Sequence, residues 1–327
     1  MATFRSRSNR WQARVRRRGH PDETGSFLTR HEAERWARSV ESEMDRGSFV
    51  SATEAQKTTL GELIQRYMVE VLPPMKGAKD DAIRLNAICR RAICKCSIAA
   101  LTSVKIAAYR DQRLKEVAAG TVIRELAYLS SIINHARREW GIHTSNPVTL
   151  VRRPTQPKGR DRIASPDELE RLLIELRPSM SRNPWMQAVV VLAVETAMRR
   201  SELLALLWPD INLERRTATL HMTKNGEARV VPLSTSAIQT LKSLPRSIGG
   251  SVFPITSYAL AANFKRATVR AGLPNFHFHD LRHTAITRMA NKLPNLIELS
   301  SVSGHKSLKM LQRYYHPDIE SLARKLG

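Results

Sequence analysis

Residues 277–316, HFHDLRHTAITRMANKLPNLIELSSVSGHKSLKMLQRYYH, hold most of the side chains in this chain that could carry out chemistry. Pro274 and Asp280 mark the start of a helix, because proline fits a helix entrance and an acidic side chain caps the free N–H groups of a first turn. His279 and Arg282 then lie about one turn apart on one helix face. This spacing predicts that both side chains point to the same place.

The rest of this stretch adds further polar groups. Gly304-His305 is expected in a loop that leads into a short helix, and Tyr314 follows it. Two more basic side chains stand upstream: Arg199 in TAMRRSELLALLW and Lys224 in TKNGEARVVPL. Lys224 is next to an Asn-Gly pair, which favours a type I′ hairpin turn, so its amine is expected near a hairpin tip.

Together these motifs resemble the tyrosine recombinase (phage integrase) family, and their amino-acid sequences are similar to those of the shufflon recombinases. A lone HxxR motif occurs in many unrelated proteins, whereas five motifs in the family's order over residues 160–320 are specific. The matching positions are Arg199, Lys224, His279-x-x-Arg282, Gly304-His305 and Tyr314. The chain departs from the usual family pattern at Ala197, Ser303 and Tyr315, none of which removes a reacting group.

The resemblance implies a site that breaks a phosphodiester without a metal. Such a reaction needs a nucleophile, a proton donor for the leaving oxygen and cations for the transition state. Arginine suits the last task because its planar fork meets two phosphate oxygens. The implied roles are nucleophile for Tyr314, phosphate clamps for Arg199 and Arg282, a third donor for His305, acceptor or relay of the tyrosine proton for His279, proton donor to the 5′-oxygen for Lys224, and support of Arg199 for Glu202.

The resemblance also implies the product and the assembly. DNA would be held through a 3′-phosphotyrosyl link with a free 5′-hydroxyl, and no cofactor, ATP or metal would be needed. A tetramer on double-stranded DNA, a Holliday junction intermediate and accessory DNA-bending proteins are expected on the same ground.

Composition points to the same kind of partner. The chain has 53 lysines and arginines against 30 acidic residues, a net charge of +23, and 42% apolar residues. It can therefore bury a core, and its charge predicts a polyanion bound through salt-dependent phosphate contacts. A merely soluble basic protein is the alternative that composition alone leaves open.

Cysteines and apolar runs bear on the compartment. Cys89, Cys94 and Cys96 are odd in number and no secretory signal is apparent, which favours free thiols in a reducing cytoplasm. No histidine or fourth cysteine stands near them at a metal-ligand spacing. The apolar run from Ala188 to Val194 is too short to span a bilayer. We expect a cytoplasmic protein associated with the nucleoid.

The predicted fold is mainly α with small β elements, in three parts. A small β-sheet with one helix over residues 1–50 resembles an arm-type DNA-binding module. A helical core-binding bundle over residues 58–150 is expected to clamp DNA, and a basic linker over 151–164 leads to a mixed α/β catalytic domain over 165–327. The basic side chains expected on phosphates are Arg14, Arg16, Arg152, Arg153, Lys158, Arg160, Lys265 and Arg266.

Local patterns predict individual elements. Three capping boxes are expected to open helices, because a Ser or Thr followed three residues later by Glu satisfies free N–H groups reciprocally. These boxes are Thr29/Glu32, Thr59/Glu62 and Ser165/Glu168. Further expected elements are a strand through Trp11, Ala13 and Val15, helices over 84–100, 121–140, 184–198, 257–272 and 318–327, and a hairpin over 217–233.

Other interpretations remain for the whole chain and for single residues. The chain could be a non-catalytic DNA-binding or architectural protein on a recombinase scaffold, or a type IB topoisomerase. Arg199 could simply pair with Glu202, and Lys224 could be a solvated turn residue. His279 and His283 have a spacing that also suits zinc. Tyr315 could replace Tyr314 after a one-residue shift in register.

Overall fold

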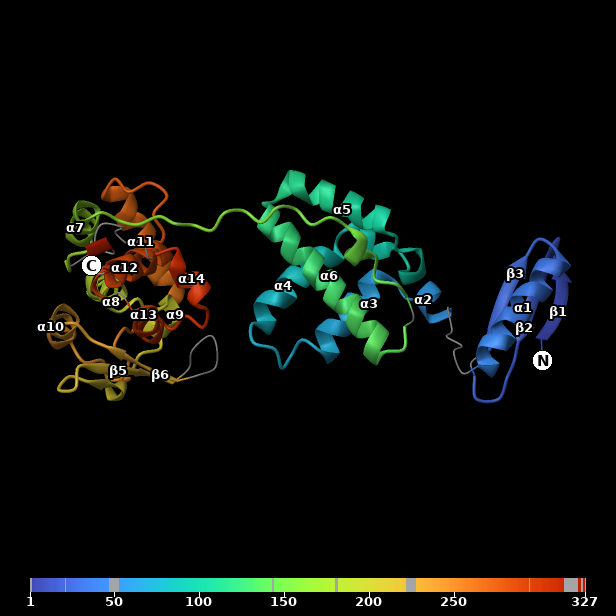
Figure 1. The fold of residues 1–327 in the computed structure, drawn as a ribbon, viewed down its shortest axis with the longest axis horizontal. Coiled ribbons are helices and arrows are strands. Elements are labelled where there is room, and N and C mark those ends of the chain that lie inside the picture. The colour runs from blue at the N-terminus through green and yellow to red at the C-terminus, as the bar shows by residue number, and fades with distance from the viewer. Residues whose placement is uncertain are drawn as a thin grey trace. The chain divides into compact units, whose positions relative to one another are not determined.

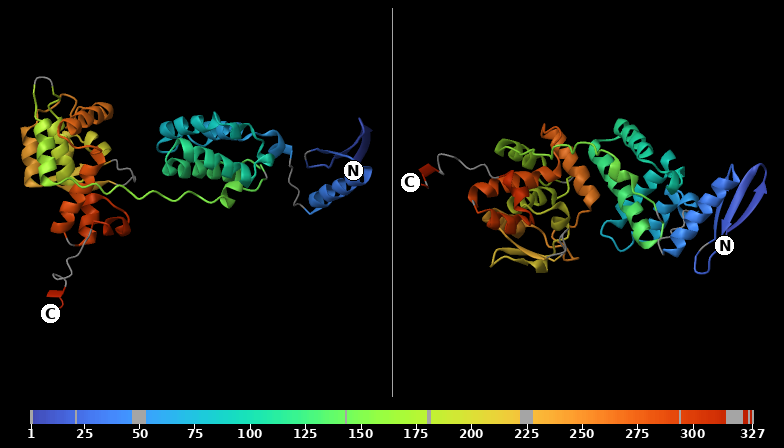
Figure 2. Two further views of the ribbon diagram at one scale, coloured as in Figure 1. Left: turned by 90° about the horizontal axis from the view of Figure 1, so that it is seen from above. Right: turned by 45° about the vertical axis from the view of Figure 1, so that its right-hand side comes forward.

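The protein is described by a computed structural model that covers residues 2–20, 22–46, 53–142, 144–179, 182–221, 228–293, 295–314, 323, 324 and 326. The chain divides into two compact units, Met1–Lys158 and Gly159–Gly327. The elements can be followed by label and colour in Figure 1 and from two further directions in Figure 2. Helices predominate and the strands form two small sheets, which confirms the predicted fold class.

The first folded part is a three-stranded antiparallel sheet with one helix along it (Figure 1). Ala13 and Val15 are fully buried against the helix, while the residues between them face outward, so the predicted alternation is confirmed. The Thr29/Glu32 capping box is present as predicted. The elements are β1 (Ala2–Arg7), β2 (Arg10–Val15), β3 (Glu23–Phe27) and α1 (Arg30–Asp45).

The second part of this unit is a helical bundle. The stripe predicted on its longest helix is confirmed, since Val122, Leu126, Leu129 and Ile133 are all fully buried. The Thr59/Glu62 capping box is also present. The elements are α2 (Thr53–Lys57), α3 (Leu60–Glu70), α4 (Ala78–Cys89), α5 (Ser103–Glu116), α6 (Ala119–Glu139) and the short 3-10 turns Ala92–Lys95, Ile98–Ala100 and Pro147–Leu150.

The helix predicted over residues 84–100 is wrong beyond Cys89. The backbone turns extended at Arg91, and the following segment pairs with the start of α3 through Leu60 N to Cys96 O and Ile98 N to Thr58 O, both 2.9 Å. These bonds satisfy backbone groups that a continued helix would have satisfied internally. They also bring Ile98 into the core, which decides against the longer helix.

The second unit is built around α8, which is buried on almost every side, as predicted for this segment. The Ser165/Glu168 capping box opens α7. Residues 152–165 carry no helix or strand. The helices are α7 (Pro166–Glu175), α8 (Met186–Thr196), α9 (Arg200–Leu204), α10 (Thr235–Ser243), α11 (Ser257–Arg270), α12 (Phe278–Lys292), α13 (Leu296–Ser303) and α14 (Leu308–Gln312), with a 3-10 turn at Trp208–Asp210.

The predicted hairpin of this unit is present as two antiparallel strands, β5 (Thr217–Leu220) and β6 (Arg229–Pro232), with β4 (Ile211–Asn212) beside β5. Leu220 pairs with Arg229, the last pair before the segment that connects the two strands. The Asn225-Gly226 turn and Lys224 lie outside the described residues, as does most of the helix predicted over 318–327.

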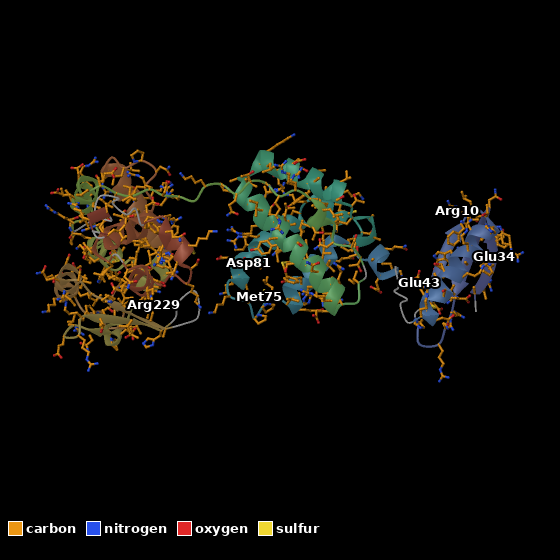
Figure 3. The ribbon with its side chains drawn as sticks, viewed as in Figure 1. Arg10, Glu34, Glu43, Met75, Asp81 and Arg229 are labelled. Atoms are coloured by element: carbon orange, nitrogen blue, oxygen red, sulfur yellow. The ribbon has the colours of Figure 1, made fainter. Side chains whose placement is uncertain are left out.

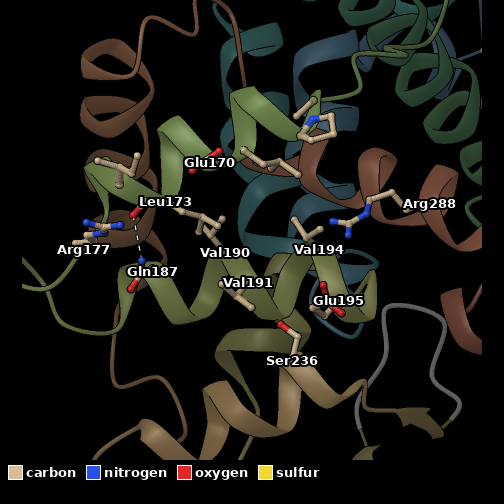
Figure 4. A pocket seen from close by; sticks show the side chains of 14 residues that line it. Glu170, Leu173, Arg177, Gln187, Val190, Val191, Val194, Glu195, Ser236 and Arg288 are labelled. Carbon is tan, nitrogen blue, oxygen red and sulfur yellow. Dashed lines mark hydrogen bonds between the residues drawn. The ribbon is translucent and has the colours of Figure 1, made fainter.

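A largely apolar hollow of about 580 Å³ opens between α7, α8, α10 and α12 (Figure 4). Leu173, Val190 and Val194 line its wall, and Glu195 and Arg288 stand at one end. None of the predicted catalytic residues lines it. Among the described helices, none has both the length and the apolar character needed to cross a bilayer.

Candidate active site

The helix α12 begins where the sequence predicts, and a buried carboxylate fixes its start. Asp280 is fully buried, and its Oδ2 accepts the backbone N–H of His277 at 2.7 Å. Arg160 donates to both carboxylate oxygens of Asp280, at 2.6 and 2.8 Å. Arg160 was expected to contact DNA. The structure places its guanidinium on the first turn of the helix that carries His279 and Arg282.

Arg282 is buried and binds the ends of two other helices. Its guanidinium donates to the carbonyl of Ala197, after α8, and at 2.6 Å to the carbonyl of Ser303, at the end of α13. Burial and the nearby charge of Arg199 lower the pKa of Arg282 to about 10, so it remains a cation at neutral pH. No carboxylate contacts this guanidinium among the described residues. A buried cation paired only with carbonyl dipoles favours an anion such as a phosphate.

Arg199 stands at the start of α9, directly after a sharp turn. Its Nη1 donates to Glu202 Oε1 at 2.7 Å, and its backbone N–H donates to Oε2 at 2.8 Å. A weaker bond of 3.4 Å reaches the carbonyl of Gly304. Ala197 in the turn has φ +53°, a region that glycine occupies without strain. This conformation explains why glycine is the usual family residue here.

Arg229 was missed by the sequence reasoning and contacts the same carboxylate. It donates from Nη1 to Oε1 of Glu202 at 3.0 Å and from Nη2 to Oε2 at 2.9 Å. Burial disfavours the ionised form of Glu202, but hydrogen bonds from Arg229 and Arg199 outweigh it and lower the pKa of this carboxyl to about 2. The alternation of side chains along a strand could have indicated Arg229 in the sequence. Residues two apart in a strand point to the same face, and Arg229 shares its face with the fully buried Val231.

His305 follows Gly304, which ends α13 with φ +67°. The hydroxyl of Ser303 donates to the carbonyl of Leu299 at 2.6 Å, so it accepts from His305 Nδ1 at 2.8 Å. The Nε2 of His305 then carries the lone pair and lies 3.5 Å from Arg282 Nη2. Burial and the charges of Arg282 and Arg199 lower the pKa of His305 to about 4, so the ring is neutral at pH 7.

Tyr314 is buried in an apolar cluster that includes Ala197, and its hydroxyl contacts Nδ1 of His283. Arg313 donates to the same hydroxyl at 2.5 Å and to that ring nitrogen at 3.0 Å. The hydroxyl therefore contacts the neighbour of His279, the residue expected to accept or relay the tyrosine proton. His279 packs edge-on against His283, with ring centroids 5.0 Å apart.

Both histidines on this face of α12 are held neutral. Burial and the neighbouring His279 and Arg313 lower the pKa of His283 to about 4. Burial and Arg282 also lower the pKa of His279. In the described part of the chain, no group of three or more His, Cys, Asp or Glu side chains is placed to hold a metal ion.

A groove of about 770 Å³ runs beside these residues, and Arg199, His279 and Lys265 line it. Arg266 lines a separate hollow with Glu175 and Arg270. In the first unit, Arg14 and Arg16 share Asp22 in exposed ion pairs, and Arg152, Arg153 and Lys158 are exposed.

Direct contacts join Arg199 and Arg229 to Glu202 and, separately, Arg282 to His305. The two sets meet at the turn before His305, where Arg199 donates to the carbonyl of Gly304 and Arg282 to that of Ser303. Tyr314 is tied to this group through His283, the neighbour of Arg282 in the chain. Lys224 lies outside the described residues.

Comparison with known proteins agrees with this geometry. Residues 162–321 match the model of the phage integrase family, and residues 56–154 match that of the phage integrase N-terminal domain. The shufflon-specific DNA recombinase of Escherichia coli is 39% identical over 280 residues, covering 83% of this chain and 72% of that protein. A Haemophilus influenzae protein named as an integrase/recombinase is 35% identical, covering all of this chain and 91% of that one.

Solved structures show the same fold. A lambda integrase dimer bound to a COC′ core site superposes with a TM-score of 0.68 at 22% identity, covering 96% of this chain and 94% of that one. The Tn1549 transposon integrase in complex with a circular intermediate DNA gives a TM-score of 0.66 at 16% identity, covering 83% of this chain and 99% of that one. The family models and the relatives together show that this chain belongs to the phage integrase family, the tyrosine recombinases.

Proposed function

We propose that this chain is a site-specific DNA recombinase that cleaves and rejoins DNA through a 3′-phosphotyrosyl intermediate, for integration, excision or inversion of a DNA segment. The observation that carries the proposal is the contact of Arg282 with His305 and of Arg199 with the turn that precedes His305. Two guanidinium groups and one ring thereby meet around the turn at Gly304, and Arg199 of this set lines the groove. Such a set of fixed donors suits the charge that develops on a phosphate.

The cleavage step follows from these positions. The oxygen of Tyr314 attacks phosphorus, and its proton passes to His283, which the hydroxyl already contacts. Arg199 and Arg282 bind the non-bridging oxygens. The bond from phosphorus to the 5′-oxygen breaks, and we assign the proton on the leaving oxygen to Lys224. The new phosphotyrosyl bond replaces the broken one, so a 5′-hydroxyl from a second duplex can later reverse the step without ATP or a metal.

The role of His305 follows from its tautomer. With Nδ1 bonded to Ser303, the neutral ring offers a lone pair from Nε2, so it donates to a phosphate only after gaining a proton. The single negative charge of a bound phosphodiester beside Arg282 favours that protonated form. We therefore propose that DNA binding charges His305 and turns it into the third donor.

The predicted DNA contacts divide by their surroundings. Lys265 lines the groove with Arg199, and Arg152, Arg153 and Lys158 are exposed, which supports phosphate contacts for these four. We propose the parts as an arm-type DNA-binding module over residues 1–50, a core-binding clamp over 58–150, a linker over 151–164 and a catalytic domain over 165–327. In this scheme Arg14 and Arg16 belong to the module, and Arg160 is a structural residue.

We propose assembly of a tetramer on double-stranded DNA of the nucleoid, with accessory DNA-bending proteins where the arm-type module has its own sites. Support comes from a lambda integrase tetramer bound to a Holliday junction, which superposes with a TM-score of 0.65 at 22% identity, covering 93% of this chain and 95% of that one. Charge supports the DNA partner as well, since the net charge is +23.

Covalent capture tests the chemistry directly. The protein is mixed with nicked fragments of its source DNA in EDTA and denatured, and the adduct is mapped by peptide and DNA sequencing. We expect an adduct on Tyr314 at one sequence, its loss in Tyr314→Phe and its retention in Tyr315→Phe. Adducts at many unrelated sequences would indicate a topoisomerase. Well-bound DNA without any adduct would indicate a non-catalytic DNA-binding protein.

A further inference from the structure

Arg229 is the one cation of this cluster to which no motif gives a role. It is the first residue of β6 and is labelled in Figure 3. Its side chain is only 13% exposed. Its two terminal nitrogens both bind Glu202, while its Nε has no hydrogen-bond partner within the described part of the chain. Burying a guanidinium costs desolvation free energy that only pairing and hydrogen bonds offset, so the position of Arg229 needs an explanation.

The first consequence of Arg229 concerns the orientation of the Glu202 carboxylate. Two parallel bonds from one planar guanidinium fix both the place and the plane of a carboxylate. The same two oxygens receive Nη1 and the backbone N–H of Arg199, at 2.7 and 2.8 Å. Arg229 therefore holds the carboxylate, and the carboxylate holds Arg199 at the entrance of α9.

The second consequence is electrostatic. Without Arg229, the single charge of Glu202 would pair with Arg199 alone and cancel much of its field at a phosphate. With Arg229 present, two cations share one carboxylate, and the group keeps a net positive charge even before Arg282 is counted. Arg199 thereby remains available to an anion.

The third consequence concerns the turn that carries His305. A Cβ added at Gly304 would lie 2.6 Å from Cζ and from Nη1 of Arg229 and 2.9 Å from Nε. Real Cβ atoms do not approach other atoms so closely, so the guanidinium packs directly under the glycine backbone. The carbonyl of Gly304 in turn accepts from Arg199 at 3.4 Å.

We propose that Arg229 is a positioning residue for strand cleavage: it holds Glu202 so that Arg199 and the Gly304-His305 turn keep their places and Arg199 keeps charge for the phosphate. The inference rests on the proposed recombinase function and deepens it. Arg229 acts through Glu202 and need not touch DNA, which separates it from the clamping arginines.

The test compares Arg229→Gln, Arg229→Lys, Glu202→Gln and the double variant Glu202→Gln/Arg229→Gln with wild type. Arg215→Gln is the matched control, because Arg215 is an exposed arginine of the same unit. Each full-length protein is given a nicked duplex that carries the captured sequence. The rate of Tyr314 adduct formation is measured under single turnover, and DNA affinity is measured separately by gel shift.

We expect Arg229→Gln to slow adduct formation about 10- to 100-fold while DNA affinity changes less than about threefold, because the fixed donors are misplaced rather than lost. Arg229→Lys should recover part of the rate, since it keeps the charge but not the paired bonds. The double variant should be no slower than the slower single variant, because both residues act through one unit. Arg215→Gln should behave as wild type.

Three results would overturn the inference. Arg229→Gln could match the control, it could lose affinity in proportion to rate, or its effect could add fully to that of Glu202→Gln. If Arg229→Gln fails to fold by circular dichroism, Arg229→Lys and the charge-neutral double variant decide, and wild-type rates in both reject the proposal. If wild type itself forms no Tyr314 adduct, the proposed function fails and this inference falls with it.

Discussion

The hydroxyl of Tyr314 lies against Nδ1 of His283, so the candidate nucleophile and a neutral base are in direct contact. Arg313 donates to both groups and thereby leaves the ring nitrogen as the acceptor. Burial, the neighbouring His279 and the charge of Arg313 lower the pKa of His283 to about 4, which keeps it unprotonated at neutral pH. A neutral imidazole next to a phenol is the arrangement that general base catalysis requires.

This contact predicts that replacing His283 harms cleavage more than replacing His279. His283→Gln should slow adduct formation about 10²- to 10⁴-fold, the usual contribution of a positioned base. His279→Gln should have a smaller effect, because His279 reaches the hydroxyl only through His283. Single-turnover rates on the nicked duplex give the comparison. The reverse order of effects would restore the acceptor role to His279.

The depressed histidine pKa values predict a loss of stability in acid. The pKa of His283 and that of His305 are lowered to about 4, whereas an unfolded histidine titrates near 6.5. Between these values the unfolded chain binds more protons, so the folded state loses stability as pH falls from about 6.5 toward 4. Urea unfolding at several pH values should show a loss of about 1–3 kcal/mol.

The control for this pH dependence is the pair of variants His283→Gln and His305→Gln in one chain. Without the two rings, the slope of unfolding free energy against pH in this window should decrease. An unchanged slope would mean that other groups cause the acid sensitivity. Glu202 titrates lower, with its pKa lowered to about 2, so it contributes stability above about 4.5 that is lost mainly below this window.

Gly304→Ala is predicted to damage both stability and activity. An alanine at φ +67° costs roughly 1–2 kcal/mol, and its Cβ would also collide with Arg229 at 2.6 Å. Gly272→Ala is the matched control, since Gly272 has φ +66° but its nearest neighbour would lie 3.6 Å from the Cβ. Urea unfolding and adduct formation should show the larger loss at Gly304. Equal losses at the two positions would mean that Arg229 moves aside freely.

Arg160→Gln is predicted to destabilise the second unit rather than to weaken DNA binding selectively. It removes the cation from a fully buried carboxylate, Asp280. Breaking a buried pair costs roughly 3–5 kcal/mol, and the 33% exposure of the Arg160 side chain reduces this to about 2 kcal/mol. Thermal unfolding measures the effect.

Arg153→Gln is the control for that prediction, because Arg153 is exposed and sits in the same basic segment. It should leave the melting temperature unchanged and reduce DNA affinity, with a smaller dependence of binding on salt. If Arg160→Gln keeps wild-type stability and weakens DNA binding in the same way, the original expectation of a phosphate contact at Arg160 is correct.

Sequence alone determined the elements whose causes are local. The capping boxes at Thr29 and Ser165 depend on groups three residues apart, so the chain fixes them wherever it folds. The stripe of α6 and the alternation of β2 are likewise read from spacing. The reactive residues could be identified for a different reason, because each family motif is a short continuous stretch of sequence and the motifs follow one another in a fixed order.

Tertiary structure alone decided which charged groups meet. Arg160 reaches Asp280 across 120 residues of chain, and Arg199 reaches the carbonyl of Gly304 across 105. No local pattern encodes such pairs, because they form only when packing of apolar faces brings distant segments together. The same packing selected His283 as the partner of Tyr314 and placed Arg229 under the active-site turn. The chemistry of each side chain belongs to the sequence, whereas its partner, burial and pKa belong to the fold.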